Sequence, residues 1–190
     1  NKMTVTDHYG TDETLLATAM ALCTDAEINP DGSVTGEPTE AALVNYAEKL
    51  GLNKNELKKS KPRAGEAPFD SMRKMMSTIH EDGNGYVQYT KGAPDEVLKK
   101  CVSIETDGQI VPLTEEMKDA ILADNKRMAG KALRVLCAAY KKYSTLPADF
   151  EPATLENELI FIGLTGMIDP VRPEVKASIE ECRAAGITPV

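Results

Sequence analysis

In the first part of the chain, apolar residues recur at helical spacing, which predicts two helices followed by a polar stretch. After Asp12, apolar residues recur at intervals of three and four over residues 16–23, which is typical of an amphipathic helix with a polar N-terminal cap. A second helix is predicted over residues 38–51, because proline suits the first helical position and glycine the position after the last. The segment 53–68 is polar and mostly basic, and it predicts a helical turn followed by a loop.

The middle of the chain predicts a β-hairpin, two helices and a long strand. Residues 72–79 and 86–91 are strand-like, and the residues between them are rich in turn formers. Thr114 is the expected N-terminal cap of the longer helix, whose first turn carries two glutamates. The other predictions are a helix over 94–100, a turn at 107–108, a helix over 114–130 and a buried strand over 132–140.

The last part of the chain predicts a strand, a helix and the start of another strand. Residues 158–168 form a nearly continuous apolar run, as in strands that are covered on both faces. A helix should begin at Pro173 and bury one face. Its inward residues are expected to be Val175, Ile179 and Cys182, and the strand after it to be 187–190. Strand–helix–strand is half of a doubly wound unit and needs further strands beside it, so residues 158–190 are expected to be a truncated piece of a larger protein.

Together these elements predict a mixed α/β (α+β) fold. It should contain a twisted antiparallel sheet flanked by helices, plus the truncated strand–helix–strand piece of a doubly wound domain. Hydrophobic content of 42% with 27% charged residues is ordinary for a soluble globular protein. The sequence contains no apolar run of membrane-spanning length and no signal-peptide pattern.

Charge changes the picture because it is unevenly distributed. The net charge of −8 argues against a general nucleic-acid or acidic-membrane binder. Residues 1–50 have a net charge of −7 and residues 104–190 of −4, whereas residues 51–103 carry ten basic and seven acidic side chains. If the protein binds a polyanion, the middle segment is where it should bind.

Cysteine and histidine spacing predicts no metal site. Four widely separated cysteines and two histidines form no CxxC pair and no zinc-ligand pattern. Three of the cysteines lie among apolar neighbours, so we expect buried thiols and a reducing, cytosolic compartment.

Two segments of the basic middle third have residues suited to a nucleotide. Lys91 and Gly92 end a predicted strand just before a proline-initiated helix, an arrangement that favours an anion; a plain turn with a solvated lysine is the alternative. Phe69 precedes a basic stretch that contains Arg73 and Lys74, and an aromatic ring beside cations suits stacking on a purine base. The alternative is a core phenylalanine.

Two further candidates lie outside that segment. Glu40 follows Thr39 in the first turn of the predicted second helix, where it either accepts the amino group of an adenine or complements the helix dipole. Arg134 lies in an apolar strand with Leu136, so it needs a partner, which is either a bound phosphate or a carboxylate. GxxxxGK[ST], GxGxxG, HExxH and Ser/His/Asp patterns are all missing, which disfavours self-contained hydrolase or dehydrogenase chemistry.

In this order, the segments TGEPTE, FDSMRKMMS, KGAPDEVL, ALRVLCAAY and GMIDPVRPEV resemble the nucleotide-binding domain of P-type cation-transporting ATPases. They are most similar to the calcium-transporting branch, in its bacterial form. The first residues resemble those that follow the family's DKTGT motif, and the last resemble those that precede its TGD motif. The resemblance implies phosphorylation-domain remnants at 1–5 and 158–190, on either side of a nucleotide-binding domain at 6–157.

The resemblance also implies roles for individual residues. Phe69 would stack on adenine, Glu40 would contact the adenine side with Thr39 beside it, and Arg134 would reach the phosphates. Further implied pocket residues are Lys74, Lys91, Gly92 and Leu136, and the implied hinge residues are Asp169 and Arg172. Animal calcium pumps have an arginine at the position of Ser71, and Arg73 is the possible substitute here.

The function so implied is ATP binding, with Mg²⁺ carried by the nucleotide. The domain would present the γ-phosphate to an aspartate outside this sequence, so by itself it should bind ATP without hydrolysing it. Its implied partners are the phosphorylation, actuator and transmembrane domains of a pump in the plasma membrane. The domain itself would be cytoplasmic and would contact neither nucleic acid nor membrane.

Two other functions stay open from the residues. A non-catalytic interaction module would use the basic segment 54–63 to dock an acidic partner protein. A small phosphotransferase of the haloacid-dehalogenase type would need a DxD/T motif after a strand, which this sequence lacks.

Overall fold

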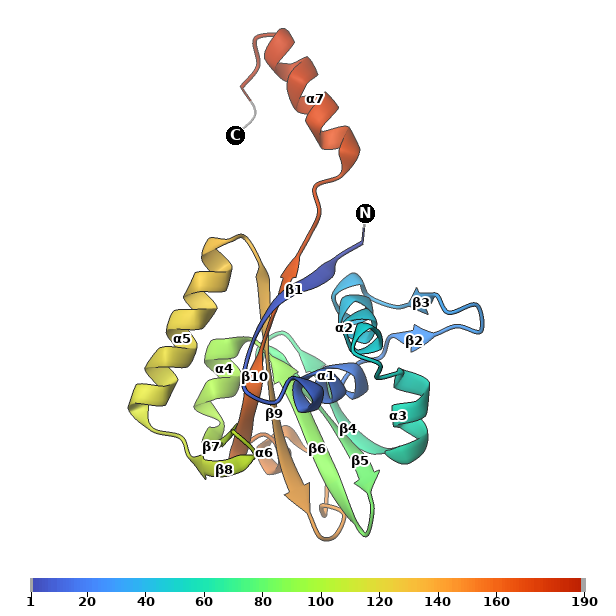
Figure 1. Ribbon diagram of the computed structural model, residues 1–190, viewed down its shortest axis with the longest axis vertical. Coiled ribbons are helices and arrows are strands. Elements are labelled where there is room, and N and C mark those ends of the chain that lie inside the picture. Colours follow the sequence, from blue (N-terminus) through green and yellow to red (C-terminus); the bar gives the residue numbers. More distant parts are fainter. Residues whose placement is uncertain (1, 189–190) are drawn as a thin grey trace.

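The computed structural model describes residues 2–188 and is built on an eight-stranded sheet. The strand order is β4-β5-β6-β9-β10-β7-β8, with β1 paired to β10 (Figure 1). All pairings in this sheet are antiparallel except that of β10 with β7. The mixed α/β fold with a mainly antiparallel sheet, predicted from the sequence, is confirmed.

The elements have the following bounds. The strands of the large sheet are β1 (Thr4–Tyr9), β4 (Arg63–Asp70), β5 (Met75–Asp82), β6 (Gly85–Gly92), β7 (Cys101–Thr106), β8 (Gln109–Pro112), β9 (Arg134–Tyr143) and β10 (Leu159–Ile168). A separate pair consists of β2 (Glu27–Ile28) and β3 (Val34–Thr35). The helices are α1 (Glu13–Leu22), α2 (Pro38–Lys49), α3 (Lys54–Ser60), α4 (Pro94–Lys99), α5 (Glu115–Gly130), α6 (Pro152–Leu155) and α7 (Pro173–Ala184).

Two hydrophobic cores lie on opposite faces of the sheet, and β9 shows why. Side chains of a strand alternate between faces, so Ala138 and Tyr140 pack in the core beneath α1 and α2, whereas Cys137 and Ala139 pack in the core beneath α4 and α5. The helices therefore cover both faces of the sheet (Figure 1). Cys23, Cys101 and Cys137 are buried free thiols, as predicted, and Cys182 is partly exposed.

The strand β10 holds the middle of this sheet together. Most of its length pairs with β9, while its other edge is shared by β7, opposite Leu159–Phe161, and β1, opposite Leu164–Ile168. The strand predicted over 158–168 is therefore present, but it lies inside the large sheet and not beside α7 in a unit of its own. Its mostly apolar sequence reflects cover on both faces.

The strand β4 is missing from the sequence prediction, which gave a loop for this segment. Gly65, Pro68 and several charged residues disfavour a central strand. An edge strand tolerates them, because one side of its backbone needs no ladder partner, and β4 is the edge strand beside β5. The hairpin loop is also shorter than predicted: Asp82 pairs with Gly85, so only Gly83 and Asn84 form the turn.

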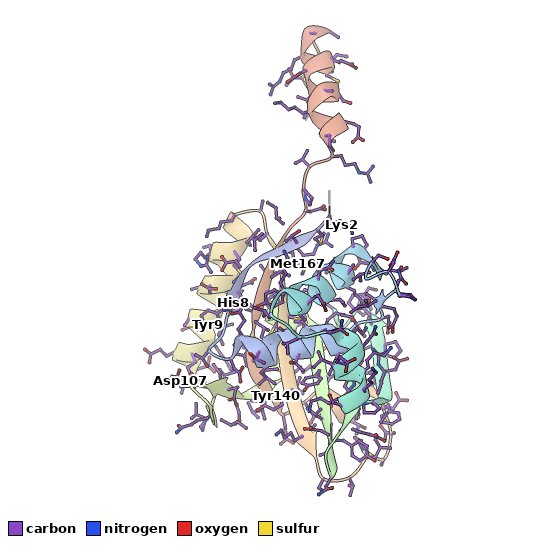
Figure 2. The ribbon with its side chains drawn as sticks, turned by 45° about the vertical axis from the view of Figure 1, so that its right-hand side comes forward. Lys2, His8, Tyr9, Asp107, Tyr140 and Met167 are labelled. Atoms are coloured by element: carbon purple, nitrogen blue, oxygen red, sulfur yellow. The ribbon has the colours of Figure 1, made fainter. Side chains whose placement is uncertain are left out.

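The helix α7 projects away from the sheet (Figures 1 and 2). It was expected to bury Val175, Ile179 and Cys182, but none of its residues is buried. The prediction of an inward face is therefore wrong for the described residues, because nothing in them packs against that face. Residues 187 and 188 form no strand, and residues 189–190, which belong to the same predicted strand, lie outside the described residues.

Close packing at Gly163 gives a test of this architecture. A Cβ at Gly163 would clash with the carbonyl oxygen of Tyr9 and lie 3.2 Å from a methyl carbon of Leu16. We expect Gly163→Ala to lower the free energy of unfolding by about 2 kcal/mol, as measured by urea denaturation. Gly130→Ala is the matched control, since a Cβ at Gly130 would have no neighbouring atom within 4 Å and alanine favours the helix. Equal stability of the two variants would contradict the close approach of β1 to β10.

Candidate functional site

The site forms around Lys91, at the end of β6 and beside the end of α1. The Lys91 side chain is only 8% exposed. Its Nζ donates to Oε1 of Glu40 at 2.6 Å and to the carbonyl oxygen of Cys23 at 2.5 Å. The alternative of a solvated lysine in a plain turn is therefore wrong. A buried ammonium needs such partners because desolvation of an unpaired charge is costly.

Glu40 joins three segments of the chain through its carboxylate. Its Oε1 accepts from Lys91, and its Oε2 accepts from the backbone N–H of Asp25 at 2.9 Å. The helix cap itself is supplied by Glu37, whose carboxylate accepts from the N–H groups of Thr39 and Glu40. Glu40 therefore does more than complement the helix dipole, since it fixes the start of α2 against α1 and β6.

Arg134 reaches the same helix terminus from β9. Its Nη1 donates to Oγ1 of Thr39 at 2.6 Å. Arg134 itself is exposed, so its other N–H groups remain accessible from solvent. The partner within the described residues is a hydroxyl and not a carboxylate, which leaves the positive charge of Arg134 available to an anion. Leu136 packs against the core on the same face of the sheet.

The aromatic residue Phe69 lies near the end of β4, just before a tight turn. Phe69 is 62% exposed, so the alternative of a core phenylalanine is wrong. The carboxylate of Asp70 accepts from the N–H groups of Met72 at 2.8 Å and Arg73 at 3.0 Å, and its carbonyl oxygen accepts from Lys74 at 2.7 Å. The hydrogen bonds to the carboxylate, that from Arg73 foremost, lower the pKa of Asp70. Lys74 closes the turn in the left-handed region, with φ of 57°.

Gly92 allows this turn to pack closely against the end of β6, beside Lys91. A Cβ at Gly92 would clash with the carbonyl oxygen of Lys74 and would lie 2.6 Å from Cβ of Met75. The same carbonyl oxygen accepts a hydrogen bond from Ala93 at 2.9 Å. Only glycine allows this approach, so the turn that follows Phe69 and Asp70 packs against the end of β6, where Lys91 lies.

Arg73 has a structural partner that the sequence analysis missed. Its Nε lies 2.8 Å from Oε2 of Glu156, whose side chain is only 3% exposed, and its Nη2 donates to the carbonyl oxygen of Pro68. These contacts occupy much of the guanidinium that was considered as a substitute for an arginine at Ser71. Glu156 follows α6, a helix too short for hydrophobic periodicity to reveal.

The basic segment 54–63 is largely neutralised inside the domain. Lys54 is buried, and every other basic side chain of the segment forms an ion pair. The pairs are Lys58–Glu27, Lys59–Glu56, Lys61–Asp82, and Arg63 with both Asp25 and Glu66. The positive charge that the sequence shows here therefore does not form an unpaired docking surface.

The predicted hinge residues lie at the exit of the sheet. Asp169 and Arg172 line an open cleft of about 630 Å³ together with Lys2, Met3 and Pro38. Lys2 and Met167 lie near each other where the chain leaves the sheet (Figure 2). The hydroxyl of Thr39 also contacts Sδ of Met3 at 3.6 Å, so this exit adjoins the Arg134 contact.

Comparison with known proteins identifies the family. Residues 13–174 match the family described as "P-type ATPase, cytoplasmic domain N". This chain belongs to that family. The chain is 45% identical over its full length to "Calcium-transporting ATPase 1" of Bacillus cereus. It is 40% identical over 98% of its length to "Calcium-transporting ATPase 1" of Lactococcus lactis, and 40% identical over its full length to "Calcium-transporting ATPase lmo0841" of Listeria monocytogenes.

The chain covers only a part of each relative. It spans 23% of the length of each of these three proteins. Within residues 2–188, no helix combines the length and the apolar character needed to cross a membrane.

The buried Lys91–Glu40 ion pair gives a prediction about the stability of the fold. We expect Lys91→Met to lower the free energy of unfolding by about 3 kcal/mol, because it leaves the Glu40 carboxylate without its cation. The double variant Lys91→Met/Glu40→Gln should recover part of this loss, since the neutral amide requires no counter-charge. Urea denaturation of the two single variants and the double variant measures the coupling. Additive effects would contradict a direct, buried pairing.

His80 gives a prediction about how the stability of the folded state depends on pH. This histidine is buried in β5, and burial lowers its pKa from 6.5 to about 4. The folded state thus keeps a neutral ring, while the unfolded chain binds a proton below pH 6.5. Stability should therefore fall as pH decreases from about 6.5 to about 4, by about 3 kcal/mol from this residue. His80→Gln should remove this component from the pH profile of urea denaturation, and an unchanged profile would contradict the assignment.

Proposed function

We propose that domain N of this chain binds ATP, with adenine stacked on Phe69 and the phosphates near Arg134. The observation that supports this most directly is an exposed aromatic ring at the end of β4, just before a hydrogen-bonded turn that packs next to the buried Lys91–Glu40 pair. An exposed ring with a cationic side chain nearby offers a π-face on which a purine base can stack.

The residues present suit the parts of the nucleotide. The ring of Phe69 offers a π-face for adenine, and Lys74 lies in the same turn with its side chain exposed. Glu40 and Thr39 would line the adenine side, with Gly92 and Leu136 forming part of the wall. Arg134 keeps donors available for a phosphate oxygen. Mg²⁺ would arrive bound to the triphosphate, whose oxygens supply some of its six ligands while water supplies others.

The whole protein is proposed to be an ATP-driven cation pump, with Ca²⁺ as the transported ion. This rests on the names of the relatives, which are calcium-transporting ATPases. Domain N would present the γ-phosphate to an aspartate in a phosphorylation domain, to which residues 1–5 and the segment beyond β10 would connect. Asp169 and Arg172 would lie at that connection, so the transfer step would require hinge closure there. Actuator and transmembrane domains are the further proposed partners, with domain N on the cytoplasmic side.

The alternative of an interaction module that uses the segment 54–63 is less well supported. All five of its basic side chains have internal partners. An acidic partner protein would have to compete with existing ion pairs, so its gain in electrostatic energy would be small.

A set of variants separates these two functions. We expect Phe69→Ala to weaken ATP binding by about tenfold or more, because base–aromatic stacking contributes about 1–3 kcal/mol. Met72→Ala is the matched control, since Met72 is exposed in the same turn. The charge reversal Lys58→Glu/Lys59→Glu should leave ATP affinity within about twofold of the unmodified chain. Isothermal titration calorimetry at fixed ionic strength measures all four proteins.

The opposite pattern would overturn the proposal. Unchanged affinity in Phe69→Ala, with loss of binding in the charge-reversed variant, would place the ligand on the basic segment. Absence of ATP binding to the folded, unmodified chain would contradict the proposed function outright.

A further inference from the structure

Lys54, the first residue of α3, is the most deeply buried charged side chain in the described part of the chain. It is 1% exposed, and its ammonium donates three hydrogen bonds. The acceptors are the carbonyl oxygen of Thr24 at 3.0 Å, the hydroxyl of Thr24 at 2.9 Å and the carbonyl oxygen of Ala26 at 2.5 Å. An ammonium has three N–H groups, so all of them are used, and all on one short segment.

That segment, residues 22–26, begins at the last residue of α1, and two more cationic side chains donate hydrogen bonds to it. Arg63 donates to the carbonyl oxygens of Leu22 and Thr24, and Lys91 donates to that of Cys23. The carbonyl groups at a helix C-terminus lack intrahelical partners and carry partial negative charge, which explains why cations collect there. Of the three cations, only Lys54 has acceptors that are all uncharged; Arg63 and Lys91 also pair with carboxylates.

The segment is also what holds the proposed adenine side of the site in place. The N–H of Asp25 donates to Glu40, and the carbonyl oxygen of Cys23 accepts from Lys91. Lys54 binds the residues on either side of Asp25, namely Thr24 and Ala26. A shift of this segment would therefore move both partners of the Lys91–Glu40 pair.

We infer that Lys54 is a positioning residue of the nucleotide site: by clamping residues 24–26, it orients Glu40 and Lys91 for ATP. This inference rests on the proposed function. The hydrogen bonds of Lys54 go to Thr24 and Ala26, so it positions Glu40 and Lys91 through the backbone of the segment.

The environment of Lys54 makes this role dependent on pH. Burial lowers the pKa of Lys54 from 10.5 to about 8. A neutral amine has two N–H groups instead of three, so deprotonation would leave one acceptor of the segment without a donor. The other charged or titratable groups that influence Lys54 or feel its charge are Glu27, Glu40, Lys58, Arg63 and His80. His80 stays neutral between pH 7 and 9, because burial lowers its pKa to about 4.

The experiment compares ATP affinity and its pH dependence in three proteins: the unmodified chain, Lys54→Met and Lys59→Met. Methionine matches the length of lysine but donates no hydrogen bond. Lys59 is the matched control because it lies on the same helix in an exposed ion pair. At pH 7 we expect about tenfold weaker binding for Lys54→Met, comparable to the loss of a hydrogen bond to a charged group, and no change for Lys59→Met.

The pH profile separates positioning from a purely structural role. From pH 7 to 9 the γ-phosphate of ATP is already ionised. Affinity of the unmodified chain and of Lys59→Met should therefore fall across pH 8, together with a shift of the Asp25 amide resonance. Lys54→Met should bind weakly without this pH step. Folding of each variant is checked by urea denaturation.

Each of the other outcomes supports or overturns the inference. Tight, pH-dependent binding by folded Lys54→Met would overturn the inference and leave the proposed function intact. If Lys54→Met does not fold, the test is made on the unmodified chain alone. A change of ATP affinity and of the Asp25 amide resonance across pH 8 supports the inference. No change in either quantity between pH 7 and 9 overturns it. Absence of ATP binding by the unmodified chain at pH 7 would overturn the proposed function and this inference with it.

Discussion

The structure of the site depends on one constraint: the charge of Lys91 is buried and must be matched. Its ammonium lies between the Glu40 carboxylate and the Cys23 carbonyl oxygen, so the end of β6, the start of α2 and the end of α1 have to meet at one point. An unpaired charge at this depth would cost several kcal/mol. The fold meets this requirement by bringing Lys91 to residues that precede it in the sequence by more than fifty positions. The neighbouring turn after Phe69 is then fixed through the close contact at Gly92.

The helix C-terminus explains why so much positive charge is found inside an acidic domain. Residues 22–26 offer backbone carbonyl oxygens that no helix bond satisfies, and Lys54, Arg63 and Lys91 occupy them. The net positive charge of the middle third of the sequence is therefore used mainly for folding. What remains accessible to a nucleotide is limited, chiefly Lys74 and Arg134. The proposed recognition by stacking, with few cations on a solvated triphosphate, would give modest affinity for ATP.

Much of the fold could be predicted from the sequence, because local signals were strong. Asp12 and Thr114 cap the helices that they were expected to cap, and two strand-like stretches around a segment rich in turn formers marked the hairpin. The edge strand β4 could not be predicted, since its glycine, proline and charges are tolerated only at an edge, which is a property of the assembled sheet. The prediction that α7 buries its apolar face failed, because periodicity shows that a face is apolar without showing what covers it. Within the site, the residue types were predictable, but the partners of Arg73 and Lys54 were not, since Glu156 and residues 24–26 are distant in sequence.

The account is tested most directly by titrating the ¹⁵N-labelled chain with ATP and recording the amide resonances together with contacts between adenine protons and aromatic side chains. It predicts contacts from adenine to the Phe69 ring and resonance shifts concentrated at residues 69–74, at Glu40 and at Lys91. It is contradicted by a folded spectrum in which those resonances stay unchanged, or in which the shifts lie on residues 54–63.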